Sequence, residues 1–308
     1  MPKYRMIAID LDGTLLGPDG SVSERTRDAV RRALSAGLLV CFATGRNWTE
    51  SRTALDAVEH YGTAVFVGGA MVIDTGKQIT LHRTKMQPEL AAEVCGVLES
   101  WGHAVLALQD TGEAGVDYLV TADLPLNRET EQWMRRTSAL VQRVTTLGGY
   151  AHEHTIRIGI CADPAEVQKV KAALLDRFGE RILCQNLLVP SAGVEVLEIF
   201  DPAVNKWEGV LHVARHHGID PDQIVAIGDD VNDVPMIAGA GLGVAMGNAK
   251  PAVRDVAKRV IGANHEEGLA AFLEEILAEH VVEPLPEPRR APGGEAETVQ
   301  GAGGSRWP

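Results

Sequence analysis

Several features are scarce in this 308-residue sequence, and each scarcity excludes a class of protein. The four cysteines lie in apolar stretches with no paired spacing, which predicts free thiols in a reducing cytoplasm and neither a disulfide framework nor a zinc site. No apolar run approaches the roughly 20 residues needed to span a bilayer. The first strand is expected to begin at Tyr4, which leaves no room for a signal peptide. We therefore expect a cytoplasmic protein without a membrane segment.

Positive charge is also in deficit, since 29 lysines and arginines face 42 aspartates and glutamates, a formal net charge of −13. Binding to nucleic acid normally requires a basic face, so we expect no nucleic-acid partner. A small anionic substrate remains compatible, because a bound metal and a local lysine or arginine can reverse the field inside one cleft. The apolar share of 45% is ordinary for a globular protein, and the length allows two domains.

Short apolar segments alternate with helical segments at both ends of the chain. Near the N-terminus, a helix at Arg25–Ala36 follows the strand at Tyr4–Asp10, and the same alternation resumes with a strand at Gln223–Ile227. Strands and helices in this order predict a parallel, Rossmann-like α/β core. We assign residues 1–82 and 187–278 to this core domain.

The middle of the chain, residues 83–186, has a different texture. Apolar residues lie on one face of two expected helices, Pro88–Trp101 and Ala165–Phe178, and short strands flank both. This pattern predicts an α/β domain inserted into the core. After residue 278 the sequence is rich in proline, glycine and glutamate and has almost no apolar periodicity, so we expect residues 279–308 to be disordered.

Two aspartates follow the first expected strand. Asp10 and Asp12 stand two residues apart, so both can point into a crevice at the carboxyl edge of the sheet, where open α/β sheets bind ligands. Two like charges this close repel each other unless a cation or a proton lies between them. The alternative is a polar turn, since Asp12-Gly13 is also a common turn signal.

Polar residues also follow later strands. Three carboxylates and an amide in Gly228-Asp229-Asp230-Val231-Asn232-Asp233 favour a hard divalent cation, although a solvated acidic loop is the alternative. Ala43-Thr44-Gly45-Arg46 stands where a strand meets a helix, a place that suits an anion because the helix start presents unpaired N–H groups. The alternative is a simple turn from strand to helix that binds no ligand. Lys206, near the start of a helix, is weak evidence alone, because most lysines are solvated surface charges.

In this order, the motifs resemble those of the haloacid dehalogenase (HAD) superfamily of phosphohydrolases. More narrowly, they resemble its Cof-type (HAD-IIB) branch, which has a large inserted C2-type cap. Thr14-Leu15-Leu16 and Val244-Ala245-Met246-Gly247-Asn248-Ala249 belong to the same resemblance. It covers the core, whereas residues 83–186 match only in length and α/β texture. The resemblance implies a Rossmann-like parallel-sheet core with an inserted α/β cap.

The resemblance also implies a role for each motif residue. Asp10 would be the nucleophile that forms an aspartyl-phosphate, and Asp12 would protonate the leaving oxygen and then activate water. The implied phosphate ligands are Thr44, Gly45, Lys206 and Asn232, and the implied Mg²⁺ ligands are Asp10, the backbone carbonyl of Asp12, Asp229 and Asp233. A phosphoryl group in transfer carries negative charge that preorganised positive groups must meet. A site built of carboxylates therefore requires both magnesium and the lysine.

Three positions depart from the pattern of the family, and one of them is His265, where an acid is common. Trp207 follows the motif lysine where glycine is usual, and its ring could narrow the site or stack on a substrate. Gly68-Gly69-Ala70 stands where the family has Asn-Gly-Ala, so any substrate contact of that Asn side chain is absent.

The function implied by the resemblance is a magnesium-dependent phosphatase that acts on a small phosphorylated metabolite, such as a sugar phosphate or a phosphorylated cofactor. A phosphomutase or phosphotransferase of the same superfamily is an alternative. A non-catalytic protein that binds a phosphorylated metabolite is less favoured, because Asp12 and Lys206 are both present. The substrate itself is not readable, since the cap supplies much of the specificity in this branch and matches the family least.

Overall fold

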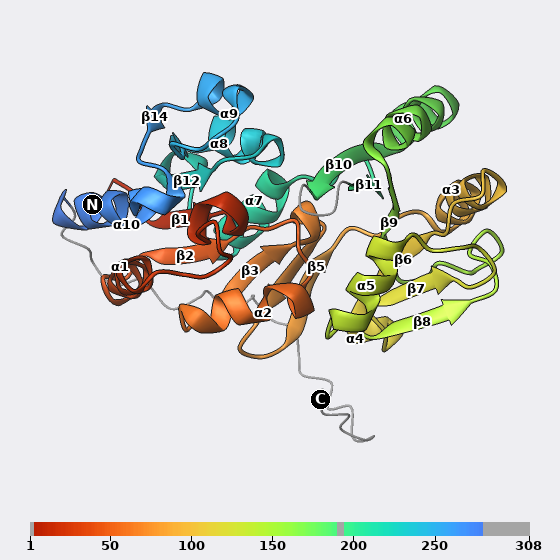
Figure 1. The fold of residues 1–308 in the computed structure, drawn as a ribbon. Helices are drawn as coiled ribbons and strands as arrows, with labels where there is room; N and C mark the ends of the chain where they lie inside the picture. The colour runs from red at the N-terminus through yellow and green to blue at the C-terminus, as the bar shows by residue number, and fades with distance from the viewer. Residues whose placement is uncertain (1–2, 190–193, 280–308) are drawn as a thin grey trace, which may run out of the picture.

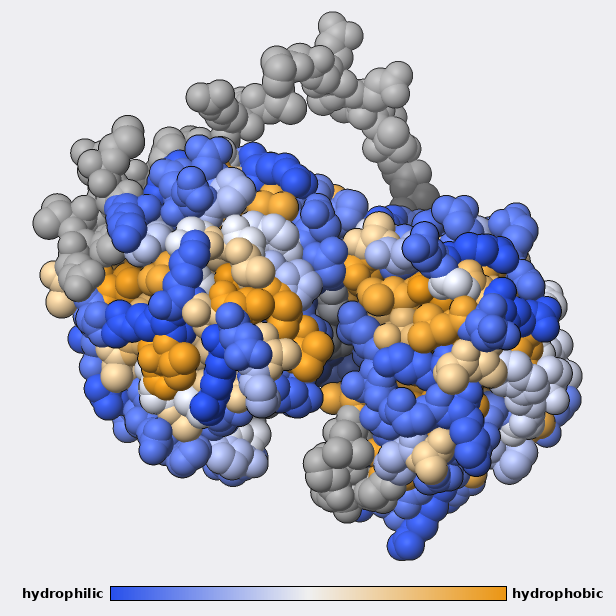
Figure 2. All heavy atoms as spheres, turned by 90° about the horizontal axis from the view of Figure 1, so that it is seen from above, coloured by the Kyte–Doolittle hydropathy of each residue, from blue (hydrophilic) through white to orange (hydrophobic). Residues whose placement is uncertain are grey.

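The computed structural model describes residues 3–189 and 194–279. These residues form two α/β units that lie side by side, each built around its own sheet (Figure 1). Seen from above, the units are two lobes, and apolar side chains are exposed on both near the place where they meet (Figure 2). Among the described helices, none combines the length and the apolar content that a bilayer crossing requires.

The first unit, the core, is centred on a five-stranded parallel sheet. Its order is β14 (Arg259–Val260), β13 (Leu242–Ala245), β12 (Ile224–Gly228), β1 (Met6–Ile9) and β2 (Leu39–Phe42). In β1, Ile7 pairs with Val225 of β12 on one side and with Val40 of β2 on the other. All four residues of β1 are buried, as expected for a strand covered on both faces. The predicted parallel α/β core is confirmed.

Helices cover both faces of this sheet (Figure 1). They are α1 (Glu24–Ser35), α2 (Trp48–Ala57), α7 (Lys206–His216), α8 (Val234–Gly239), α9 (Pro251–Val256) and α10 (Gly268–Glu279). Helix α2 begins two residues before the expected Glu50, because Asn47 and Glu50 form a capping box in which each side chain accepts from the other's backbone N–H. The motif Ala43-Thr44-Gly45-Arg46 lies between β2 and this cap. The cap therefore helps to fix the path of the chain from the end of β2 to the start of α2.

A small antiparallel sheet leads from the core to the second unit. It consists of β3 (Thr63–Phe66), β4 (Met71–Asp74) and β5 (Ile79–Arg83). A parallel bridge between Ala43 and Val65 joins it to the residue that follows β2. The chain leaves the core after β5, close to the predicted boundary at residue 82.

The second unit, the cap, has a six-stranded mixed sheet. Its order is β10 (Leu183–Val189), β11 (Val194–Phe200), β9 (Thr155–Ala162), β6 (Leu106–Gln109), β7 (Tyr118–Thr121) and β8 (Val141–Val144). Two helices, α3 (Pro88–Ser100) and α6 (Pro164–Phe178), bury their apolar faces against one side of the sheet. Two shorter helices, α4 (Thr111–Ala114) and α5 (Arg128–Arg136), complete the unit.

The return from cap to core lies later in the chain than expected. The predicted boundary between residues 186 and 187 falls inside β10, and β11 pairs with β9 of the cap sheet. The hairpin of β10 and β11 therefore belongs to the cap sheet, because its backbone hydrogen bonds continue that sheet to Phe200. The tail predicted to be disordered lies outside the described residues from position 280 onward.

The glycine pair after β3 allows a close approach between the two halves of the core. Gly69 has a φ of +107°, and a Cβ atom there would lie 1.9 Å from the carbonyl oxygen of Asn205, directly before α7. A side chain at this position would push the start of α7, and Lys206 with it, away from the sheet.

We predict that Gly69→Ala destabilises the protein by about 1–3 kcal/mol more than Gly20→Ala, because overpacking adds to the backbone strain. Gly20 is a matched control, since its φ is +77° and no atom lies within 4 Å of a Cβ built there. Urea unfolding of the two variants measures the difference. Equal losses of unfolding free energy in the two variants would show that the close approach to Asn205 adds no cost of its own.

Candidate active site

The predicted carboxylates converge at the carboxyl edge of the core sheet. Asp10 follows β1, Asp229 follows β12, and Asp233 ends a single 3₁₀ turn just before α8. One carboxylate oxygen from each of the three lies within 4.8 Å of the others, and we call these residues the acidic cluster. The parallel pairing of β1 with β12 explains how residues more than 200 positions apart meet.

Lys206, the first residue of α7, lies against this cluster. Its Nζ donates to Oδ1 of Asp10 at 2.5 Å and to Oδ1 of Asp233 at 2.6 Å, and its side chain is only 1% exposed. A buried ammonium requires paired charges, and here two carboxylates supply them. Burial by itself lowers the pKa of Lys206, but the charges of Asp10 and Asp233 outweigh it and raise that pKa above its ordinary value.

The acidic cluster holds more negative charge than one lysine balances. Burial, together with the charge of Asp233, raises the pKa of Asp10 well above its usual range. The same two causes raise the pKa of Asp229 to about 7. Each shift means that the ionised carboxyl lacks compensation at that place. A divalent cation would provide it, and closely spaced, buried carboxylate oxygens are suitable ligands for a hard ion such as Mg²⁺.

Asp233 also holds the loop that presents Asp229. Its Oδ2 accepts hydrogen bonds from the backbone N–H groups of Asp229 and Asp230, both at 3.0 Å, while its Oδ1 accepts from Lys206. Gly228 leaves the room for this arrangement, since a Cβ there would lie 2.5 Å from the Asp233 carboxylate. The loop is therefore fixed before any ligand binds.

Two further side chains orient Asp229. Thr14 donates from Oγ1 to one carboxylate oxygen at 3.2 Å, and Asn248 donates from Nδ2 to the other at 3.2 Å and to the carbonyl of Gly13 at 2.8 Å. Asn248 belongs to the motif Val244-Ala245-Met246-Gly247-Asn248-Ala249, and no role was predicted for its side chain. Its place shortly after the end of β13, at the same edge of the sheet, is the signal that could have identified it.

Asp12 lies apart from the acidic cluster and is more exposed. Its carboxylate forms a two-pronged ion pair with the guanidinium of Arg46, in which Nε lies 2.8 Å from Oδ2. Arg46 belongs to the motif after β2, but its pairing with Asp12 was not predicted. The structure therefore separates Asp12, paired with an arginine, from Asp10, paired with a lysine.

The remaining predicted phosphate ligands lie around the same edge. Thr44 is buried, and its hydroxyl oxygen accepts from the backbone N–H of Arg46 at 3.1 Å. Asn232 and Gly45 are neighbours, because a Cβ on Gly45 would lie 3.7 Å from Asn232 Nδ2. The Oδ1 atom of Asn232 is buried without a hydrogen-bond partner among the described residues. Such an unsatisfied amide fits a site that is completed by a ligand.

Trp207, whose ring could have narrowed the site or stacked on a substrate, packs against α8. Its indole lies against Gly239 of α8, where a Cβ atom would come within 2.4 Å of the ring. The absence of a side chain at Gly239 creates the space that the ring fills.

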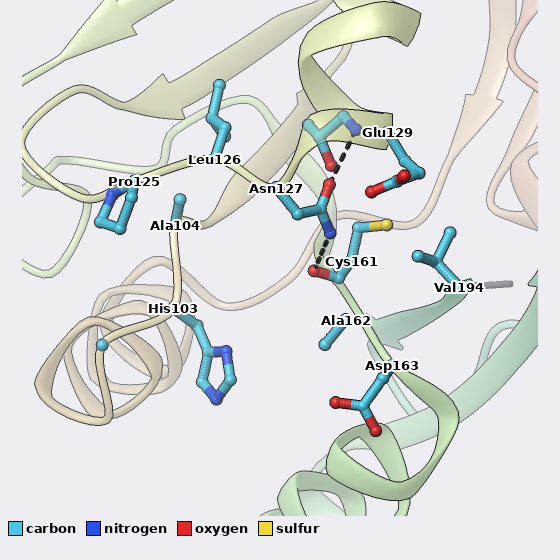
Figure 3. A pocket seen from close by; sticks show the side chains of 12 residues that line it. His103, Ala104, Pro125, Leu126, Asn127, Glu129, Cys161, Ala162, Asp163 and Val194 are labelled. Carbon is cyan, nitrogen blue, oxygen red and sulfur yellow. Dashed lines mark hydrogen bonds between the residues drawn. The ribbon is translucent and has the colours of Figure 1, made fainter. Parts of the chain in front are cut away.

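A separate cavity of about 410 Å³ lies within the cap (Figure 3). Asn127 stands in its wall, donating from Nδ2 to the carbonyl of Cys161 at 2.6 Å and accepting on Oδ1 from the backbone of Thr130 at 2.8 Å. The side chains of His103 and Asp163 enter from other elements. The described lining contains no residue of the acidic cluster, so this cavity is distinct from the site.

Comparison with known proteins agrees with this geometry. The family model for haloacid dehalogenase-like hydrolases matches residues 7–273. A 5-amino-6-(5-phospho-D-ribitylamino)uracil phosphatase of Bacillus subtilis is 30% identical over 280 residues, covering 90% of this chain and 98% of the relative. An HMP-PP phosphatase of Serratia proteamaculans is 26% identical over 279 residues, covering 89% of this chain and 96% of that protein.

Solved structures show the same fold. A haloacid dehalogenase-like hydrolase from Bacteroides thetaiotaomicron superposes with a TM-score of 0.75 at 22% identity, covering 89% of this chain and all of that one. A sugar phosphatase of HAD subclass IIB superposes with a TM-score of 0.72 at 19% identity, covering 88% of this chain and 98% of that one. The chain therefore belongs to the haloacid dehalogenase-like hydrolase family, as a phosphatase of its Cof-type branch.

Proposed function

We propose that this protein is a cytoplasmic, magnesium-dependent phosphatase that hydrolyses a small phosphorylated metabolite through a phosphorylated Asp10. The observation that carries the proposal is the acidic cluster, in which Asp10 and Asp233 are buried and which one lysine contacts but does not neutralise. Asp10, Asp229, Asp233 and the backbone carbonyl of Asp12 would hold the cation. When bound, the cation would compensate the carboxylates and polarise the phosphoryl group.

The side chains divide the chemistry between two aspartates. Asp10, fixed by Lys206, attacks phosphorus, and the leaving alcohol departs as its oxygen takes a proton from Asp12. Asp12 then takes a proton from the water that attacks the phosphorus of the aspartyl-phosphate, which releases inorganic phosphate and restores Asp10. Lys206 stays charged throughout, so it balances the negative charge on the phosphoryl oxygens. Thr44, Gly45 and Asn232 would bind those oxygens.

Two relatives support the proposed substrate class. The Bacillus subtilis relative is named for a phosphorylated ribityl compound and the Serratia relative for HMP-PP. We propose a substrate of similar size, a sugar phosphate or a phosphorylated cofactor. A panel of such metabolites, assayed for phosphate release in Mg²⁺ and in excess chelator, tests the activity and its metal requirement together.

Asp10→Asn should reduce phosphate release to background, because the amide is a poor nucleophile and a poor ligand. Asp56→Asn is the matched control, since Asp56 is an exposed aspartate on α2. Circular dichroism and the melting temperature establish that both variants fold. Phosphatase activity close to that of the wild type in folded Asp10→Asn would contradict the nucleophile assignment.

Asp12→Asn should lower kcat/KM for an alkyl phosphate by about 10²–10⁴-fold, the usual contribution of general acid–base catalysis. The loss should be much smaller for p-nitrophenyl phosphate, because nitrophenolate leaves without a proton. Steady-state assays with both substrates measure the ratio. Equal losses would assign Asp12 a role other than that of the acid.

Asp229 should make the metal-free protein sensitive to pH. Its pKa is about 7 in the folded state and near 3.8 in the unfolded state, so the folded state binds its proton more tightly. The stability that this proton provides is complete below about pH 4 and is lost as the pH rises through 7.

Asp229→Asn should therefore raise the melting temperature in EDTA, and its advantage over the wild type should grow from pH 5 to pH 7 and then level off. Saturating Mg²⁺ should reverse this advantage, because only the wild type retains the ligand. Asp56→Asn should follow the wild type throughout. A melting temperature of Asp229→Asn that exceeds that of the wild type by the same amount at every pH would refute the raised pKa of Asp229.

A further inference from the structure

The cap sheet carries a buried ion pair that the proposed chemistry does not use. Arg157 of β9 and Glu198 of β11 form it, with side chains only 11% and 13% exposed. Burial raises the pKa of Glu198, and the neighbouring guanidinium opposes that rise. A buried pair usually adds little net stability compared with well-packed apolar residues. The other contacts of Arg157 are therefore more informative about the role of this pair than its effect on stability.

The contacts of this arginine lead to the core. Its Nη2 donates to the hydroxyl of Tyr118 at 3.0 Å, and its Nη1 donates to the carbonyl of Gly45 at 3.4 Å. The same tyrosine hydroxyl accepts from Nδ2 of Asn47 at 3.4 Å. Glu198 thus forms an ion pair with Arg157, and Arg157 donates a hydrogen bond to Tyr118. Arg157 and Tyr118 both contact the segment between β2 and α2.

A second contact lies beside the first. Thr49 donates from Oγ1 to Oδ1 of Asp117 at 3.1 Å. Inside the cap, Asp117 accepts from the hydroxyl of Thr111 at 2.6 Å and from the backbone of Leu140 at 2.8 Å, so its carboxylate is held in place. All three of these hydrogen bonds with the core fall on residues 45–49, which we call the docking segment.

The docking segment also carries the partner of the proposed acid. Arg46 lies between the docked residues Gly45 and Asn47, and its guanidinium pairs with both carboxylate oxygens of Asp12. Glu50, the capping-box partner of Asn47, interacts electrostatically with both Arg46 and Arg157. A shift of this segment would therefore move the guanidinium that orients Asp12.

We propose that Tyr118 and Arg157 are positioning residues of the cap, which dock on residues 45–49 and thereby hold Arg46 against Asp12. The proposal rests on the proposed role of Asp12 as the acid and base. The two cap residues act through the docking segment, so they set the efficiency of proton transfer to the leaving group. Each contact is a single hydrogen bond, two of them long, so each contributes a small factor.

Tyr118→Phe and Thr49→Val test this directly, because each removes one hydroxyl and keeps the shape of the side chain. Each should lower kcat/KM for a sugar phosphate that the wild type hydrolyses by about 2- to 10-fold, and that for p-nitrophenyl phosphate by less than twofold. Tyr150→Phe in the cap and Thr53→Val on the exposed face of α2 are matched controls, and both should behave as the wild type.

Hydrogen exchange gives a readout that does not depend on activity. The backbone amides of residues 46–50 should exchange faster in Tyr118→Phe and Thr49→Val than in the two controls, while the strands of the core sheet keep their protection. Unchanged exchange in this segment, or equal losses of kcat/KM on both substrates, would overturn the proposal.

Asp12→Asn separates this proposal from the proposed function. Equal losses on both substrates in Asp12→Asn would refute the acid role itself. Substrate-selective loss in Asp12→Asn, without selective loss in Tyr118→Phe and Thr49→Val, would refute the docking role alone.

Discussion

The contact of one buried ammonium with two carboxylates is the interaction on which the rest of the structure depends. Lys206 lies between Asp10 and Asp233, which come from opposite ends of the sequence. Without it, the edge of the sheet would hold buried carboxylates with no compensating charge, and folding would have to protonate them. The parallel sheet, the glycine pair after β3 and the short 3₁₀ turn before α8 all bring these groups to one point.

Much of this arrangement could be predicted from the sequence, because strand ends follow simple rules. Asp10 and Asp229 each stand directly after an apolar run, and parallel strands place such residues at one edge. Lys206 was ambiguous alone, since nothing local to a lysine shows whether it is buried. Its position became interpretable through the resemblance of the whole motif set. The family and the α/β core were correctly predicted for the same reason.

What the sequence did not reveal depends on contacts between distant segments. The partner of Asp12 is 34 residues away, and Arg157 meets Gly45 across 112 residues. No periodicity or spacing encodes such pairs. The division at residue 186 failed to follow the sheet for a similar reason, because the hairpin of β10 and β11 is apolar enough to suit either unit and only its pairing with β9 assigns it. Helix α2 begins at Trp48 and not at the expected Glu50, because the side chain of Asn47 caps its first turn.

The placement of the inserted unit has a consequence for how such a protein can change over generations. The acidic cluster and its lysine come from elements before residue 84 and after residue 200, so the sequence of the cap can drift without altering them. The exceptions are the places where the two units touch, among them the hydrogen bonds of Tyr118 with Asn47 and of Asp117 with Thr49. There a change on one side disturbs a hydrogen-bond partner on the other. The sequences of the two units thus constrain each other at these contacts, and also where Leu108, Val120 and Ile156 of the cap pack in one apolar cluster with the core.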